Sequence, residues 1–137
     1  QALSVKPQNA FAAVERLQGE LLSLKEKAVR LEEAAFSHTA AQYRNAGSVL
    51  HITEKLDGDG VRRLCDAIAR AAGGRCAVFA GSDGGYQYAV IESGGDLRQL
   101  IKDMNAALHG RGGGRDGFAQ GSAACTAEEI RAFFAGR

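Results

Sequence analysis

The stretch RCAVFAGSDGGYQYAVIE, residues 75–92, decides the fold. Its first seven residues are mostly apolar and predict a strand. Residues 82–85, with the sequence SDGG, are typical of the tight turn that joins two antiparallel strands. The following residues, YQYAVIE at 86–92, predict a second strand that pairs back on the first. The chain therefore contains a β-hairpin, to which the neighbouring segments must be added.

Upstream of the hairpin we expect one more strand and a helix. SVLHITE at residues 48–54 predicts a short strand, and Asp57 to Gly60 predicts a turn that can also cap a helix. Apolar residues then recur at helical spacing at Val61, Leu64, Cys65, Ile68 and Ala72. Gly73 and Gly74 are expected to end that helix.

Downstream of the hairpin we expect two more helices. After a polar break at residues 94–96, the first has an apolar face of Leu97, Leu100, Ile101, Met104 and Leu108. The last begins near Thr126, where Glu129 completes a capping box. Its apolar face comprises Ile130, Phe133 and Phe134. The order β-α-β-β-α-loop-α predicts an α/β (α+β) fold with a small mixed sheet covered by helices.

The first 47 residues differ because they carry a heptad pattern. Steps of three and four connect Val14, Leu17, Leu21, Leu24, Ala28, Leu31, Ala35 and His38. This spacing is typical of a coiled-coil seam. A helix over residues 8–45 would be about 57 Å long, more than the remaining domain can cover. We therefore predict a helical dimerisation or linker segment, 1–47, and a globular domain, 48–137.

The charges beside the seam favour a partner helix. Glu20 and Lys27 fall at heptad position g, and Lys25 and Glu32 fall at position e. Two copies can therefore form ion pairs in either relative direction. We predict a homodimer through Val14, Leu17, Leu21, Leu24 and Leu31. The alternative is a helix that folds back on its own domain.

Composition limits the function. The chain has 137 residues and a net charge of +1, which argues against a strongly basic nucleic-acid-binding arm and an acidic tail. No apolar run reaches the roughly 18 residues of a membrane span and no signal peptide is visible, so we expect a cytoplasmic protein without membrane contact. Cys65, Cys76 and Cys125 form neither a zinc pattern nor a disulfide framework, and we expect buried, reduced thiols.

The most informative segment is HGRGGGRDGFAQGS, residues 109–122, with six glycines in 14 residues. Consecutive glycines allow close backbone approach, and their amides can form an anion-binding nest. Arg111 and Arg115 beside such a nest suit phosphate. A second interpretation is a loop whose glycines serve close packing. The segment lacks the Lys-Ser/Thr pair of a P-loop and does not follow a strand as a Rossmann fingerprint does.

Within this segment, GGGRDGFAQG at residues 112–121 resembles the Gly-Gly-Gly-Arg…Ala-Gln-Gly motif of the DHH-associated domain. That domain ends alanyl-tRNA synthetases and long-form alanyl-tRNA editing proteins, and it also follows the catalytic domain of DHH-family phosphoesterases. The phosphoesterases usually have His in place of Arg115 and Ala in place of Gln120, so both residues resemble the alanyl branch. LSVKPQNAFAAVERLQGELLSLK at residues 3–25 resembles the helical linker before this domain. Ser122 departs from the family, which often has Gly there.

The resemblance implies a non-catalytic C-terminal module that binds tRNA, expected to be alanine tRNA, and dimerises through its helix. The parent would be an alanyl-tRNA editing hydrolase or an alanine-tRNA ligase. We expect no catalytic residue, metal site or cofactor within this chain. The predicted tRNA-binding residues are Arg111, Gly112, Gly113, Gly114, Arg115, Gln120 and Gly121. The alternatives are the substrate-binding C-terminal half of a DHH-family phosphoesterase and a coiled-coil adaptor without a ligand.

Other side chains have simpler interpretations. We expect His51 to be a packed or surface histidine. Tyr86 and Tyr88 alternate on one strand face, where cross-strand packing is favoured over base stacking. Phe118 is interpreted as a core anchor, and Gln120 either holds the glycine loop or meets a base or ribose.

Overall fold

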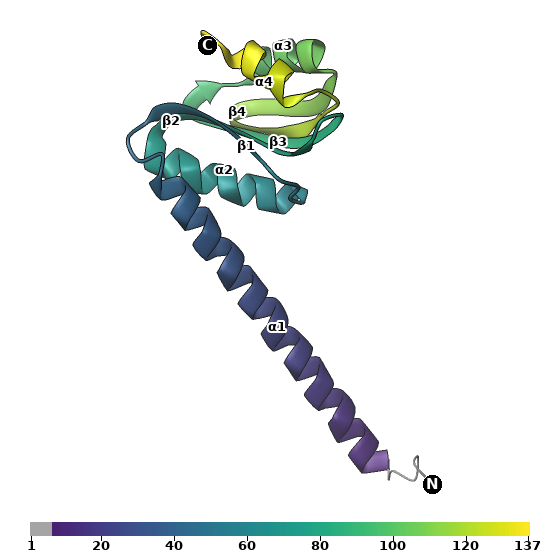
Figure 1. Cartoon of the computed structure of the whole chain (residues 1–137). Helices are drawn as coiled ribbons and strands as arrows, with labels where there is room; N and C mark the ends of the chain where they lie inside the picture. Colours follow the sequence, from purple (N-terminus) through teal and green to yellow (C-terminus); the bar gives the residue numbers. More distant parts are fainter. Residues whose placement is uncertain (1–6) are drawn as a thin grey trace. The chain divides into compact units, whose positions relative to one another are not determined.

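The computed structural model describes residues 7–137, with side chains from Phe11 onward. Residues 1–6, where the predicted segment 1–47 and the helical resemblance begin, lie outside the described residues. The elements follow the chain in the order shown in Figure 1. They are α1 (Pro7–Ala41), β1 (Gly47–Thr53), α2 (Gly58–Ala72), β2 (Gly73–Ser82), β3 (Gly85–Asp96), α3 (Arg98–Leu108), β4 (Gly110–Ala123) and α4 (Ala127–Phe134).

The chain divides into two compact units between Ala35 and Phe36. The first unit is the greater part of α1, a single continuous helix. The second unit begins within α1, because Phe36 and Ala40 are buried in its core. After α1, Asn45 adopts a left-handed conformation with φ of 60° and leads into β1. Because Phe36 packs in this core, the last turns of α1 belong to the globular domain. The boundary between the two units therefore lies upstream of the predicted domain boundary at residue 47.

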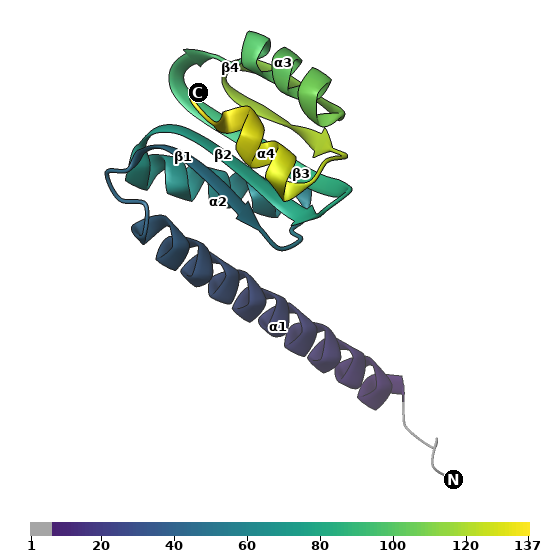
Figure 2. The same ribbon diagram turned by 45° about the horizontal axis from the view of Figure 1, so that its top comes forward.

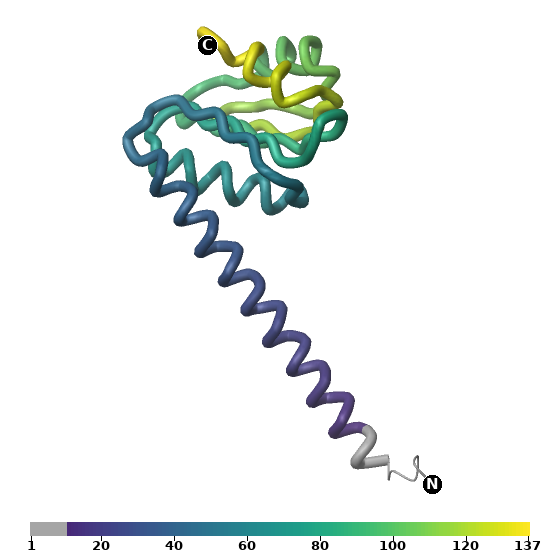
Figure 3. Tube along the Cα trace, in the orientation of Figure 1, coloured from purple at the N-terminus to yellow at the C-terminus, as the bar shows by residue number. Residues whose placement is uncertain are grey.

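The sheet of the second unit is mixed, with strand order β1-β2-β3-β4. β1 and β2 are parallel and are connected through α2, a path that can be followed in Figure 3. β2 and β3 form the predicted antiparallel hairpin, in which Ser82 pairs with Gly85. β4 is antiparallel to β3. The predicted fold class is confirmed.

Helices cover both faces of this sheet (Figure 2). On one face, α3 and α4 bury Phe79, Tyr88 and Val90. On the other face, α2 and the end of α1 pack against Cys76, Val78 and other apolar residues. β2 alternates between the two clusters and is buried on both sides, which explains its nearly continuous apolar sequence.

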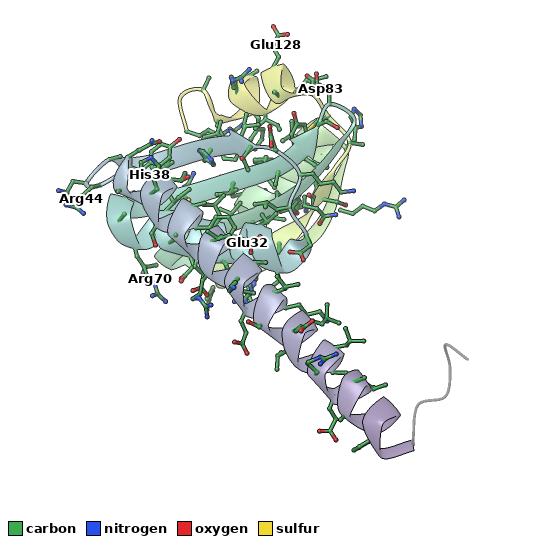
Figure 4. All side chains as sticks on the ribbon, turned by 60° about the horizontal axis from the view of Figure 1, so that its bottom comes forward. Glu32, His38, Arg44, Arg70, Asp83 and Glu128 are labelled. Carbon is green, nitrogen blue, oxygen red and sulfur yellow. The ribbon has the colours of Figure 1, made fainter. Side chains whose placement is uncertain are left out.

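The predicted starts of α2 and α4 are confirmed, whereas α1 ends at Ala41, before the predicted end at residue 45. The Asp57 carboxylate accepts a hydrogen bond from the Gly60 amide at 2.7 Å and caps α2. Thr126 and Glu129 form the capping box of α4. The turn between β2 and β3 is also tied to α4, because the Asp83 carboxylate accepts from the Ala127 amide at 2.9 Å. Figure 4 shows Asp83 beside the helix that carries Glu128.

The predicted glycine loop is wrong, because residues Gly110–Ala123 form strand β4. Its second half pairs with β3, with Phe118 opposite Ile91 and Ala123 opposite Tyr86. Its first half folds back antiparallel along the second half. The Ala124 amide donates to the His109 carbonyl at 3.3 Å, and Gly112 lies against Gly121. Glycine has low strand propensity and no side chain to alternate, so a segment this rich in glycine carries no strand signal.

Close packing explains several of the glycines in β4. A Cβ atom on Gly121 would lie 2.7 Å from the Gly112 Cα atom and 2.7 Å from the Tyr88 hydroxyl. A Cβ atom on Gly114 would lie 3.0 Å from the Ile101 side chain. Gly113 differs, because the space where its Cβ would lie is open. Packing therefore excludes a side chain at Gly112 and Gly121 but not at Gly113.

We predict that Gly121→Ala lowers the free energy of unfolding by about 1–3 kcal/mol, because the methyl group forces the two halves of β4 apart. Gly113→Ala is the matched control and should change it by less than about 0.5 kcal/mol. Urea unfolding followed by circular dichroism measures both. Equal stability of the two variants would contradict the packing argument.

His51 of β1 is a half-buried histidine next to Tyr43. The Tyr43 hydroxyl and His51 Nδ1 are 2.8 Å apart, and the two rings meet edge to face. Burial lowers the pKa of His51 below its ordinary value of 6.5. The folded domain therefore favours the neutral imidazole.

This pKa shift predicts a stability loss in mild acid. Below about pH 6.5 the unfolded chain takes up a proton at His51 more readily than the folded chain, so stability present at pH 7 falls with the pH. We expect the wild-type free energy of unfolding to fall more between pH 7 and pH 5 than that of His51→Asn, which keeps a polar atom near Tyr43 but does not titrate. Parallel pH profiles for the two proteins would contradict this.

Candidate nucleic-acid interface

A pocket of about 620 Å³ lies at one end of the sheet. We call it the sheet-end pocket. Lys55 after β1, His109 at the end of α3 and Arg111 of β4 supply its cationic or titratable side chains, and Glu54 is its acid. It lies beyond the carboxyl ends of the parallel strands β1 and β2, where ligands bind in open α/β sheets.

Glycines form much of the wall of this pocket. Gly81 lies near the end of β2, Gly84 in the turn that follows, and Gly85 at the start of β3. Because they have no side chains, a ligand can approach their backbone closely, although the Gly84 amide already donates to the Cys125 carbonyl at 2.8 Å. The pocket therefore combines an unobstructed glycine wall with a local excess of positive charge, an arrangement suited to an anion.

The core fixes the glycine segment next to this pocket. The buried Tyr88 hydroxyl donates to Asn105 Oδ1 at 3.0 Å, and Asn105 Nδ2 donates to the Gly112 carbonyl at 3.2 Å. Burial raises the pKa of Tyr88, so its hydroxyl stays protonated as a donor. Asn105 could not be predicted from the sequence, because a single polar residue in a helix carries no motif signal. The predicted packing role of Tyr86 and Tyr88 is confirmed, because both rings contact Phe79.

The predicted anion nest is wrong in its geometry. Gly112, Gly113 and Gly114 lie in a strand, and none of the three has a positive φ. In an extended strand successive amides point to opposite edges, so these three amides do not converge on one anion. Gly112 and Gly113 are nevertheless exposed and leave room for a ligand to approach the backbone.

Arg115 lies apart from Arg111, in a second pocket. This pocket, of about 260 Å³, is lined by Arg62, Asp66, Ile91, Arg115 and Phe118. Phe118 belongs to neither core cluster, so its interpretation as a core anchor is wrong. It lies on the edge strand at the border of α2, where less of its surface is covered.

Gln120 has a positioning contact. Its Nε2 donates to the Gly58 carbonyl at 2.7 Å and ties β4 to the first turn of α2. Gly58 is separated from Gln120 by 62 residues, so this bond connects two elements far apart in the sequence. Of the two roles considered for Gln120, the observed contact is the one that holds β4.

The two arginines of β4 carry charges that no ion pair neutralises. Arg62, Arg63, Arg70, Arg75 and Arg98 form the ion pairs seen in the described part of the chain. Within residues 7–137, neither Arg111 nor Arg115 has an ion-pair partner. Their charge is therefore available to a ligand on a protein that is nearly neutral as a whole.

The predicted dimer residues lie on α1 with their side chains exposed. Exposed fractions reach 62% at Leu24 and 72% at Leu31, and the other seam residues Val14, Leu17 and Leu21 are also exposed. Side chains project from α1 along its length in Figure 4. Leu22 and Val29, at heptad position b, are exposed as well and were missed because they lie off the seam.

The described residues contain neither a cluster of side chains that could bind a metal ion nor a helix that could span a membrane. Between residues 7 and 137 there is no group of three or more His, Cys, Asp or Glu side chains placed to hold a metal ion. No helix in that range has the length and apolar character needed to cross a membrane. The three cysteines are buried and free.

Comparison with known proteins identifies the domain. A family model described as the DHHA1 domain matches residues 46–135. No curated protein matches the chain. Among solved structures, the C-Ala domain of Aquifex aeolicus alanyl-tRNA synthetase is similar at a TM-score of 0.53 and 18% identity, over 62% of this chain and 85% of that one. RecJ from Thermus thermophilus, in complex with Mg²⁺, is similar at a TM-score of 0.65 and 20% identity. That match covers 90% of this chain but only 19% of RecJ.

Proposed function

Because the chain belongs to the DHHA1 domain family, we propose that it is a non-catalytic, tRNA-binding and dimerising module of an alanyl-tRNA synthetase-like or alanyl-tRNA editing protein. The likeness of its fold to the C-Ala domain supports this choice, as do Arg115 and Gln120 within the glycine motif. The observation that carries the proposal is the sheet-end pocket, in which the unpaired Arg111 lies beside exposed glycine backbone. A role on tRNA would place the protein in the cytoplasm.

The pocket suits the phosphate backbone of RNA. Arg111 can hold a phosphate through two hydrogen bonds, and Lys55 adds a point charge nearby. The exposed Gly113 allows the sugar-phosphate chain to approach without a steric clash. Few charges take part, so we expect modest affinity that depends on salt but little on sequence.

We predict a slope of roughly −2 for log affinity against log salt, if Arg111 and Arg115 each neutralise one phosphate at about 0.9 per contact. Arg111→Ala should weaken binding of alanine tRNA and flatten the slope by about one unit. Arg115→Ala should flatten it by a similar amount. Affinity measured by fluorescence anisotropy over a salt series gives both quantities.

Lys25→Ala is the control for loss of a positive charge, because Lys25 belongs to the helical unit. This variant should change the slope of log affinity against log salt little. The double variant Arg111→Ala, Arg115→Ala must lose affinity. If it binds tRNA as the wild type does with the same slope, β4 is not the RNA-binding surface and its glycines serve packing alone.

The dimer part of the proposal rests on the exposed seam of α1. Three leucines, Leu17, Leu21 and Leu24, occupy consecutive seam positions and are exposed in the described helix. A second copy of the same helix would cover them and would pair the charges at positions e and g. The partner expected is therefore another copy of this chain.

Sedimentation equilibrium tests the dimer. We expect the wild-type chain to sediment as a dimer and the Leu21→Asp, Leu24→Asp variant as a monomer, because buried carboxylates at the seam lack partners. Leu22→Asp is a matched control, since Leu22 is similarly exposed on the same helix but lies off the seam. It should remain dimeric. A monomeric wild type would overturn the dimer.

The second candidate is the substrate-binding C-terminal half of a DHH-family phosphoesterase. The match to RecJ over 90% of this chain favours it. In that case the sheet-end pocket would bind a short phosphodiester in place of a folded tRNA. A competition experiment distinguishes the two functions. If a dinucleotide displaces tRNA from the domain at equal concentration, the phosphoesterase is favoured. If only tRNA fragments displace it, the tRNA-binding module is favoured.

A further inference from the structure

The second pocket, which we call the edge pocket, is formed by Arg62, Asp66, Ile91, Arg115 and Phe118. It lies on the face of the sheet that α2 covers. Phe118 must face that side because the next residue, Ala119, is buried in the cluster of the opposite face. The edge pocket therefore lies beside the cluster on the α2 face, against which Ile91 packs, and combines residues of α2, β3 and β4.

Phe118 is placed unusually for a phenylalanine. It is half-buried, and its ring lies outside both core clusters. The Arg115 guanidinium lies 6.0 Å from the centre of the ring. An aromatic ring that lines a pocket next to a cation offers a surface for stacking.

The charges of the edge pocket have an excess of cations. Arg62 comes from α2 and is held by Asp59 at 2.8 Å. Asp66 is engaged by Arg70 at 2.9 Å. Arg115 has no ion pair in the described part of the chain. The pocket thus contains two guanidinium groups, one carboxylate and an aromatic ring, and Arg115 is its one charge without an ion pair in the described part of the chain.

The size of the edge pocket restricts the ligand. About 260 Å³ is smaller than the usual pocket for a drug-sized ligand and fits a single planar group. A flat ring to stack on Phe118 and an adjacent anion for the arginines are both present in one nucleotide. A duplex cannot use this site, because its bases are already stacked on each other.

We propose that the edge pocket binds one unpaired nucleotide of RNA, with its base stacked on Phe118 and its phosphate beside Arg115 and Arg62. The proposal rests on the proposed function, since it specifies which part of a tRNA the domain contacts: an unpaired base in a loop or at an end. It adds base stacking to the phosphate contacts of the sheet-end pocket.

The test compares a single-stranded RNA heptamer with a blunt duplex of the same sequence, each followed by fluorescence anisotropy. We expect the wild type to bind the single strand more tightly. Phe118→Leu keeps an apolar side chain and should reduce single-strand affinity by about 5- to 100-fold. Its affinity for the duplex should not change.

Phe133→Leu is the matched control. Phe133 is also half-buried and has the Arg137 guanidinium 4.3 Å from its ring centre, but it belongs to α4. This variant should bind both RNAs as the wild type does. Thermal unfolding checks that Phe118→Leu is folded.

Cross-linking tests the wild type directly and needs no variant. A heptamer that carries 4-thiouridine, irradiated with the protein and digested with trypsin, should attach to the peptide of residues 116–131, which contains Phe118. Attachment only to other peptides, or equal single-strand affinity of the wild type and Phe118→Leu, would overturn the proposal. If the wild type binds and cross-links the heptamer but not tRNA, the proposed function fails and the edge pocket stands. If tRNA binding depends on Arg111 but not on Phe118, and the heptamer is not bound, only the edge pocket fails.

Discussion

Two backbone segments touch where Gly112 lies against Gly121 beside the hydroxyl of Tyr88, and the rest of β4 depends on this contact. A side chain at Gly112 would meet backbone atoms of Gln120 and Gly121, which pair with β3, and one at Gly121 would meet the backbone of Arg111 and Gly112. The contact allows the first half of β4 to fold back along its second half. Asn105 then holds the folded segment from α3.

The fold-back of β4 determines where Arg111 and Arg115, the two cations of the glycine motif, lie. Arg111 and Arg115 are four residues apart, and a single flexible loop could aim both at one phosphate. In the folded strand, Arg111 lines the sheet-end pocket and Arg115 lines the edge pocket. One short motif therefore supplies a cation to each of two surfaces, and an RNA that touches both must extend across the edge of the sheet.

Periodicity and capping predicted most of the fold because they are local. The apolar alternation of β2, the helical spacing around Leu64 and the capping box at Thr126 each depend on residues a few positions apart. β4 could not be predicted in this way, since its contacts depend on residues far away and its glycines carry no pattern. The bond from Gln120 to Gly58 and the position of Phe118 beside α2 have the same origin.

The near-neutral charge connects the two parts of the proposed function. A domain with a net charge of +1 and two unpaired arginines in β4 gains little from long-range attraction to RNA. A second copy of the domain in the same complex raises the effective concentration of RNA-binding sites without any new contact. Pairing of two copies through Leu21 and Leu24 of α1 would supply that second domain. Under the proposed function, the exposed leucines of one unit and the sparse cations of the other would have a common explanation, because a weak RNA-binding domain binds more tightly when it is linked to a second copy.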